Sequence, residues 1–214
     1  MRAQGMVTQY AFFVNSDACS GCKTCQVACC DAHDIPASTA PWREVIEVVA
    51  GGWTQKGALW SSNVTAYNLS VACHHCADFV CARGCQGDAI WKRHDGIVLI
   101  DDIRCTRCRK CEADCPYGAI HWDSLTNREQ KCDFCADDID NGGAPACVTA
   151  CPNRALDFGE LSELRARYGK TQHVHPLPDP SISDPSLVIK PHRHAGVGTD
   201  PAARLGPSRS PFPV

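Results

Sequence analysis

The spacing of the cysteines constrains this chain more than any other feature of its sequence. Sixteen of its 17 cysteines fall into four groups of four, here called quartets one to four. Quartets one and three share the spacing C-x2-C-x2-C-x3-C, whereas quartet two widens one gap and quartet four separates a C-x2-C pair from a C-x3-C pair. In sequence order the quartets are Cys19, Cys22, Cys25 and Cys29; Cys73, Cys76, Cys81 and Cys85; Cys105, Cys108, Cys111 and Cys115; and Cys132, Cys135, Cys147 and Cys151.

Such runs of three cysteines with a fourth close behind are typical of bacterial ferredoxins, in which the fourth cysteine ligates the cluster of a second run. Pro116 and Pro152 directly follow the last cysteine of quartets three and four, as in that signature. We therefore predict four iron–sulfur clusters. Because no quartet lacks a member, all four are predicted to be [4Fe–4S] and not [3Fe–4S].

Crossed ligation also predicts which cysteines share a cluster. Nested pairing, outer quartet with outer and inner with inner, is the natural solution for four quartets in a row. The predicted ligands are Cys19, Cys22, Cys25 and Cys151 for cluster a; Cys132, Cys135, Cys147 and Cys29 for cluster b; Cys73, Cys76, Cys81 and Cys115 for cluster c; and Cys105, Cys108, Cys111 and Cys85 for cluster d. Cys30 is left over, and we predict a small buried residue and not a ligand, because adjacent residues do not easily reach one iron.

Two other uses of the cysteines fit the sequence less well. A secreted disulfide framework is disfavoured by the odd number of cysteines, by the tight triple runs and by a start that does not resemble a signal peptide. A zinc-dependent interaction module would use paired C-x2-C loops, but the triple runs exceed what one tetrahedral zinc needs.

Composition and motifs exclude several other functions. The formal net charge is −3 and the basic residues are dispersed, so no nucleic acid partner is expected. No stretch approaches the roughly 20 apolar residues that cross a bilayer, so no direct membrane span is predicted. No catalytic residues stand out, and we predict a chain that is not an enzyme on its own.

The predicted fold class is α+β: two interleaved bacterial-type 2[4Fe–4S] ferredoxin modules with short hairpins and helices, followed by an extended C-terminal arm. The outer module takes residues 1–68 with 123–170, including an insertion at 31–72, and the inner module takes residues 69–122. Strands are predicted at 7–14, 45–49, 119–122 and 155–158, a hairpin at 88–100 with an Asp95-Gly96 turn, and a helix at 160–168 closed by Gly169.

Residues 171–214 are predicted to form a proline-rich extended tail that contacts a partner. Nine of the 14 prolines lie from His175 onward, and hydrophobic periodicity is lost there. Leu187, Val188 and Ile189 offer apolar surface, so we expect residues 171–192 to lie along a partner subunit and the last twenty to be a tail.

Charged and aromatic residues beside the cysteines suggest further roles. Arg104, Arg107, Arg109 and Lys110 surround quartet three, and positive charge near a cluster raises its potential. Cluster d is therefore predicted to have the highest potential, unless these cations face solvent or a partner. His74 and His75 lie inside a C-x2-C loop, where we expect them to support the ligands or lie at the surface and not to bind iron.

Segments outside the quartets resemble the four-cluster electron-transfer subunits of complex iron–sulfur molybdoenzymes, most closely those of the dimethyl sulfoxide reductase branch. The resemblance runs from about residue 7 to residue 192. It rests on TQYAFFVNSDACSGCKTC, AGGW at 50–53, HDGIVLID at 94–101, CPYGAI at 115–120, CPNRALDFGELSELRARYG at 151–169 and PSLVIKP at 185–191. The chain departs from the pattern at Gln86, where a proline is expected, and at Cys30, where a polar residue is expected; neither removes a ligand.

The resemblance implies the partners and the direction of electron flow. Electrons would pass from a membrane anchor that oxidises menaquinol, through the four clusters, to a catalytic subunit carrying molybdenum bis(pyranopterin guanine dinucleotide). The substrate would be dimethyl sulfoxide or an N-oxide; polysulfide, tetrathionate, nitrate and formate enzymes of the same family remain alternatives. By analogy, the outer module would face the catalytic subunit and the inner module the membrane.

Localisation follows from the same resemblance. The chain is expected to be peripheral, held at the membrane through its partners. Clusters must be assembled in the cytoplasm, where thiols stay reduced. Export with a twin-arginine partner is open, and the side of the membrane stays undetermined.

Overall fold

Short strands and short helices alternate with the cysteine loops along the chain. The structure is a computed structural model that describes residues 8–195 and the backbone of residues 204–205. The strands are β1 (Tyr10–Asn15), β2 (Arg43–Ala50), β3 (Trp53–Lys56), β4 (Leu59–Ser62), β5 (Thr65–Ala72), β6 (Ile90–Lys92), β7 (Val98–Ile100), β8 (His121–Asp123), β9 (Arg128–Gln130), β10 (Leu156–Glu160), β11 (Leu187–Lys190) and β12 (Arg204–Leu205). The helices are α1 (Thr24–Ala32), α2 (Lys110–Asp114), α3 (Ala136–Asp140), α4 (Ala146–Thr149) and α5 (Leu161–Tyr168), with 3-10 turns η1 (Val80–Ala82) and η2 (Pro180–Ile182).

This mixture of small elements is α+β, as predicted. Within the described residues, no helix combines the length and the apolar character that crossing a membrane requires.

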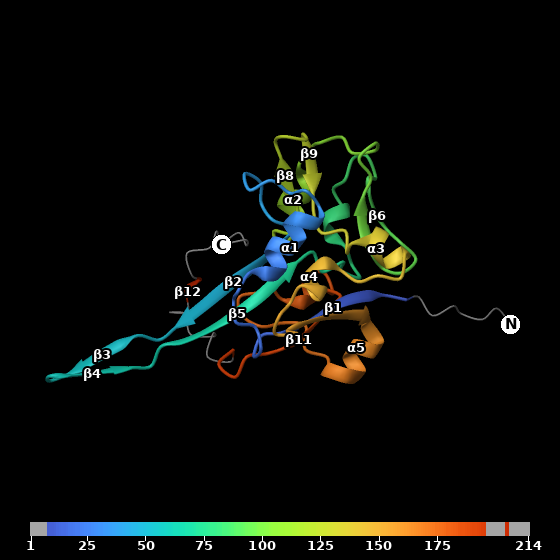
Figure 1. Ribbon diagram of the computed structural model, residues 1–214. Helices are drawn as coiled ribbons and strands as arrows, with labels where there is room; N and C mark the ends of the chain where they lie inside the picture. Colours follow the sequence, from blue (N-terminus) through green and yellow to red (C-terminus); the bar gives the residue numbers. More distant parts are fainter. Residues whose placement is uncertain (1–7, 196–203, 206–214) are drawn as a thin grey trace.

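A three-stranded sheet in the order β10-β1-β11 forms the base of the molecule (Figure 1). Strand β1 runs antiparallel to β10 and parallel to β11. Because side chains alternate along a strand, β1 supplies two cores. Ala11 and Phe13 pack on Leu164 of α5 and on Val188, whereas Phe12 and Val14 face the main core, which the cysteines share.

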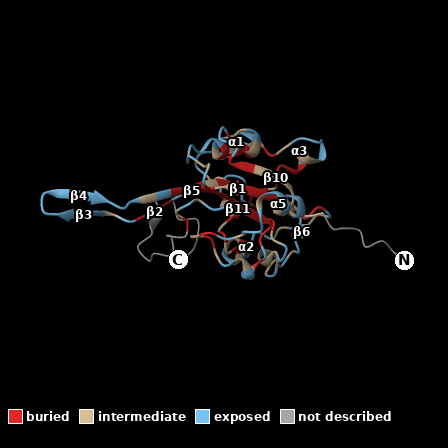
Figure 2. Cartoon of the chain, turned by 90° about the horizontal axis from the view of Figure 1, so that it is seen from below, coloured by how far each residue is buried: buried red, intermediate tan, exposed pale blue. Residues whose placement is uncertain are grey.

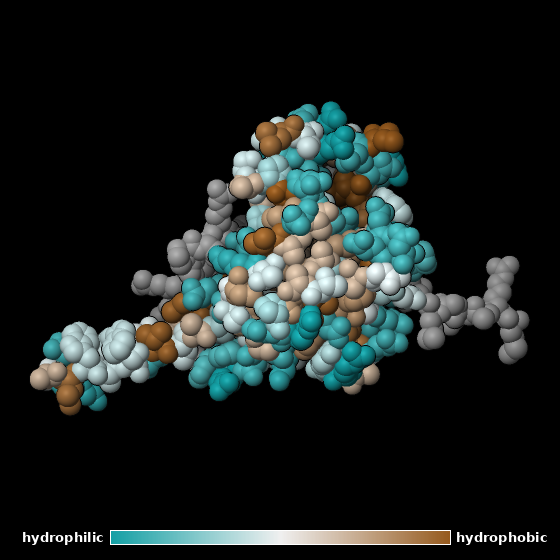
Figure 3. All heavy atoms as spheres, viewed as in Figure 1, coloured by the Kyte–Doolittle hydropathy of each residue, from teal (hydrophilic) through white to brown (hydrophobic). Residues whose placement is uncertain are grey.

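A long β-hairpin lies beside this sheet and projects from the rest of the molecule. Strands β2 and β5 pair antiparallel from Arg43↔Ala72 to Ala50↔Thr65, and β3 and β4 continue the hairpin beyond them. The inner half is largely buried, but every residue of β3 and β4 is exposed, which Figure 2 shows as a pale blue projection. Trp53, Leu59 and Trp60 are among these exposed residues. Figure 3 shows the projection standing clear of the body with apolar side chains on it, an arrangement typical of contact surfaces.

Most predicted elements are confirmed, with shifted ends. Strands β1, β2 and β10 and helix α5 lie where the patterns place them, and β6 pairs with β7 across the Asp95-Gly96 turn. In that turn the Arg93 N–H donates to the Ile97 carbonyl oxygen at 2.8 Å, and Gly96 has φ +84°. Strand β8 begins two residues later than predicted, and its partner β9 has too little apolar alternation to be detected from the sequence.

The structure corrects the prediction for the proline-rich segment. Leu187, Val188 and Ile189 form β11 on this chain's own β1 and are at most 3% exposed. Val174 and Leu177 are also buried in the main core. The apolar residues of this segment therefore complete the body of the molecule and are not left for a partner. Of the last twenty residues, all but Ala195 and the backbone of 204–205 lie outside the described residues.

We predict that β11 stabilises the fold without help from a partner. Ile189→Ala should lower the free energy of unfolding by about 2–5 kcal/mol, because it removes a fully buried side chain. Ile182→Ala is the matched control: it lies in the same segment, is 48% exposed, and should change stability by less than about 0.5 kcal/mol. Urea unfolding of the purified protein, followed by circular dichroism, measures both. Equal, small effects would show that the segment is not docked in solution.

Candidate iron–sulfur sites

The first three cysteines of quartet one meet the last cysteine of quartet four. Cys19, Cys22, Cys25 and Cys151 line one hollow, together with Val45 of β2 and Ser70 of β5. Burial raises the pKa of the Cys19 thiol, and the neighbouring Cys25 and Cys151 thiols add to the rise. These are the four residues predicted for cluster a.

The four cysteines predicted for cluster b are all buried. They are Cys29, Cys132, Cys135 and Cys147. Helix α1, which carries Cys29, packs on α4, which carries Cys147. Burial raises the pKa of Cys29 to about 12, despite the opposing charge of Arg43, and Cys147 and Cys135 raise it further.

The inner quartets form corresponding groups. A second hollow is lined by Cys73, Cys76, Cys81 and Cys115, the residues predicted for cluster c, with Phe79 and Val98 among its apolar walls.

The remaining cysteines, predicted for cluster d, lie where α2 packs on η1. Burial raises the pKa of Cys111 to about 12, and Glu129 and the Cys105 thiol raise it further. The Cys108 sulfur accepts from several donors, which include the backbone N–H of Gln86, the residue after Cys85.

One backbone feature recurs in all four quartets and explains how the thiols converge. The residue just before the second cysteine has positive φ in each case: Gly21 (+72°), His75 (+45°), Arg107 (+60°) and Phe134 (+68°). Only glycine adopts this left-handed region without a steric cost. A left-handed residue reverses the chain locally, so each C-x2-C loop curls and its two cysteines come closer together. Three of the four quartets accept this cost on a non-glycine residue.

A second recurring feature holds the last cysteine of quartets two, three and four. The backbone N–H four residues later donates to its sulfur: Ala89 to Cys85 at 3.2 Å, Ala119 to Cys115 at 3.4 Å, and Ala155 to Cys151 at 3.3 Å. Each alanine leads into a short strand, so these bonds join the cysteine loop to the strand that follows it. N–H···S bonds of this kind tune iron–sulfur potentials.

The cysteines predicted for clusters a, b, c and d are here called groups a, b, c and d, and interactions between their thiols link group a to group b and group b to group c. The Cys147 thiol of group b raises the pKa of Cys25 in group a through an electrostatic interaction. In the same way, the Cys73 thiol of group c raises the pKa of Cys132 in group b. Within quartet two, η1 and the Cys85 N–H bond to the Ala82 oxygen connect group c to group d. Only two of the sixteen cysteines are exposed, Cys22 in group a and Cys108 in group d. The exposed thiols therefore lie in the first and last groups.

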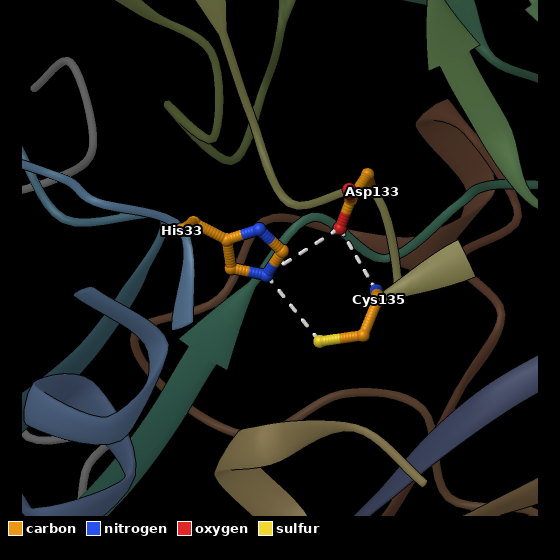
Figure 4. A group of neighbouring side chains, drawn as sticks. All are labelled: His33, Asp133 and Cys135. Carbon is orange, nitrogen blue, oxygen red and sulfur yellow. Dashed lines mark hydrogen bonds and ion pairs between the residues drawn. The ribbon is translucent and has the colours of Figure 1, made fainter. Parts of the chain in front are cut away.

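The side chains of His33, Asp133 and Cys135 lie close together, an arrangement that the sequence patterns did not reveal (Figure 4). His33 follows α1, and its Nε2 lies 3.3 Å from Cys135 Sγ and 3.7 Å from Asp133 Oδ1. The Cys135 N–H donates to Asp133 Oδ1 at 2.8 Å. Since Cys135 already belongs to group b, we interpret His33 and Asp133 as groups that orient this thiol and not as a separate metal site.

The remaining residues singled out in the sequence divide between core and surface. His74 and His75 are buried; burial, with Arg43 adding, lowers the pKa of His74 to about 3, and His75 Nδ1 accepts from the Val98 N–H at 3.0 Å. Cys30 is partly buried on α1. The four cations around quartet three are all exposed, so water screens their electrostatic effect on the cysteines of group d. Arg109 also forms an ion pair with Glu112. Whether cluster d has the highest potential stays a prediction.

The donor set fits iron–sulfur clusters. All 17 cysteines are free thiols, so a disulfide framework is absent. Burial raises the pKa of most of them, which means that a buried thiolate needs a compensating cation, and bound iron supplies one. The two hollows and their converging sulfurs have the ligand number that a cube requires.

Comparisons with known proteins agree with this chemistry. Residues 64–161 match the 4Fe-4S dicluster domain family. The sequence is 42% identical to the B subunit of anaerobic dimethyl sulfoxide reductase from Escherichia coli, over 89% of this chain and 92% of that protein. It is 40% identical to the corresponding subunit from Haemophilus influenzae, over 94% and 98%, and 31% identical to the B subunit of polysulfide reductase from Wolinella succinogenes, over 90% and 99%. The protein thus belongs to the family of anaerobic dimethyl sulfoxide reductase B subunits, iron–sulfur subunits that transfer electrons and are not the catalytic subunits.

Proposed function

We propose that the protein holds four [4Fe–4S] clusters and relays electrons through them in the order a, b, c, d or its reverse. The observation that carries the proposal is the series of four cysteine groups, in which the two inner groups hold no exposed cysteine and each end group holds one. Inner centres without an exposed ligand are shielded from oxidants in solution, whereas end centres near the surface can exchange electrons with a partner.

The division into two modules follows from the same groups. Groups a and b join quartets one and four, and groups c and d join quartets two and three, which supports an outer and an inner ferredoxin module with crossed ligands. Strands β2 and β5 of the insertion wall the outer module, since Val45 and Ser70 line its first hollow.

The partners follow from the family. Its members are named as one subunit of a multi-subunit reductase, which supports a molybdenum catalytic subunit at one end and a quinol-oxidising membrane anchor at the other. We place the catalytic subunit at the Cys22 end and the anchor at the Cys108 end. Ile103, 96% exposed beside quartet three, gives the Cys108 end an apolar contact point.

Dimethyl sulfoxide or an N-oxide is the substrate class we favour for the complex. The identity to dimethyl sulfoxide reductase subunits, 40–42%, exceeds the 31% to the polysulfide reductase subunit. The choice of substrate is made at molybdenum and not in this protein. We further propose a peripheral membrane location through the partners, after assembly in the cytoplasm.

Metal content tests the proposal most directly. Anaerobically purified protein should hold about sixteen iron and about sixteen acid-labile sulfide per molecule, the content of four cubes. Stoichiometric zinc in place of iron would instead identify an interaction module without redox function.

Substitution of single cysteines tests the ligand assignment. Cys132→Ser should lose one centre, or about a quarter of the iron, because it removes a buried ligand of cluster b. Cys30→Ser is the matched control and should keep all the iron, because Cys30 is not assigned to a cluster. Iron analysis and electron paramagnetic resonance measure both variants; iron loss in Cys30→Ser would refute the assignment.

Photo-crosslinking tests the orientation. A photoreactive residue at Lys23, exposed beside Cys22, should capture the catalytic subunit in the intact complex, whereas one at Ile103 should capture the anchor. The reverse result would invert the direction of the relay without altering its composition.

A further inference from the structure

Arg43 is the one arginine that is buried in the described part of the chain, and it lies near the thiols of groups a and b. It is the first residue of β2, is 1% exposed and has the largest fully buried side chain among the described residues. Its guanidinium lies over the Phe12 ring, with Cζ 4.4 Å from the ring centroid. No carboxylate forms an ion pair with it within the described part of the chain. Arginine is rarely buried without a partner, because removing its charge from water is costly.

The guanidinium uses only part of its hydrogen-bonding capacity within the protein. Nη1 donates to Ser70 Oγ at 3.1 Å, and Ser70 Oγ lies 3.4 Å from Cys25 Sγ. Among the described residues, neither Nε nor Nη2 has an acceptor, although both are buried. Buried donors of this kind are nearly always satisfied, so two N–H groups in this position point to an acceptor-rich group between the thiols.

The charges around Arg43 come from both cysteine groups of the outer pair. Burial alone lowers its pKa, but the Cys147, Cys132, Cys25 and Cys29 thiols raise it more, and the net shift is upward. Cys25 belongs to group a and the other three belong to group b. Because arginine is always charged in proteins, Arg43 presents its positive charge to the ligands of two predicted clusters at once.

We propose that Arg43 is a shared counter-cation of clusters a and b, whose free N–H groups donate to cluster or ligand sulfur and raise both reduction potentials. The inference rests on the proposed four-cluster function. Reduction adds one negative charge to a cluster, and a positive charge in a medium of low polarity stabilises the reduced form. Arg43 is a positioning residue in this role, since it holds no electron itself.

Burial distinguishes Arg43 from the other cations near cysteines. Lys131 is also buried, but its Nζ is satisfied by the carbonyl oxygens of Val98 and Cys132. Arg107 and Lys23 lie beside exposed ligands and are surrounded by water, which screens their charge. Of these four basic residues, Arg43 is the one that is fully buried and also has N–H groups without an acceptor among the described residues.

The test compares potentials of Arg43→Gln and Arg43→Lys in the anaerobically purified, cluster-loaded protein, by redox titration with electron paramagnetic resonance. Arg43→Gln removes the charge and should lower the reduction potentials of two of the four clusters by at least about 59 mV. For transfer of one electron, this shift is a tenfold change in the equilibrium constant for reduction. Arg43→Lys keeps the charge but loses the planar donors, so it should shift the same two clusters by less. Lys23→Gln, beside the same ligands but exposed, is the control and should shift none.

Iron content separates the possible failures. If the parent protein lacks iron, the proposed function is wrong. If Arg43→Gln keeps its iron and all four potentials, the role of Arg43 is wrong and the four-cluster function stands. Loss of about half the iron from either Arg43 variant supports a counter-cation of the outer pair, because clusters c and d do not depend on it. Loss of all four clusters contradicts that assignment.

Discussion

Convergence of thiols from distant parts of the chain is the constraint on which the rest of this structure depends. Each of the four proposed sites needs four sulfurs in one small volume. The helices and strands of the molecule are too short to be stable through their intrinsic propensities alone. Left-handed residues curl the C-x2-C loops, and the N–H bonds to Cys85, Cys115 and Cys151 tie the loops to the strands that follow. Ligand binding at sites of this kind is coupled to folding, since such sites require contacts between segments far apart in the sequence.

The electrostatics of the interior follow from this arrangement. Burial makes the charged thiolate form of cysteine unfavourable, and cations near the cysteines oppose this effect. Some of these cations are exposed, whereas Arg43 is buried. The arginines around quartet three are exposed, so water and salt screen their charge. Arg43, in contrast, lies where water does not reach, between the thiols of two groups. A charge of this kind acts on cluster potentials with little screening, which makes position within the fold more important than the number of nearby basic residues.

The same fold sets how far each group of cysteines is exposed. Groups b and c hold no exposed cysteine, whereas Cys22 and Cys108 open the end groups to the surface. The sheet of β10, β1 and β11 supports the outer module and draws the proline-rich segment into the body. The exposed β3–β4 hairpin then remains as the main projecting apolar element of the described residues, in keeping with a subunit that functions within a complex.

Much of the site chemistry was already determined by local spacing. Cysteines at fixed intervals identify ligands because a loop of two residues limits how far apart two thiols can lie, and strands such as β1 and β2 follow from alternation. Spacing says little about contacts between remote segments. It left Leu187 to Ile189 for a partner, because an apolar run does not reveal which surface covers it. It also gave no sign of His33 beside Cys135, or of Arg43 among the thiols. Arg43 begins an ordinary strand in the sequence, and only the packing of β2 against α1, β1 and β5 removes it from water. The candidate ligands are thus identified by the sequence, whereas the electrostatic surroundings of each cysteine group are decided by tertiary structure, because burial depends on segments far apart in the sequence.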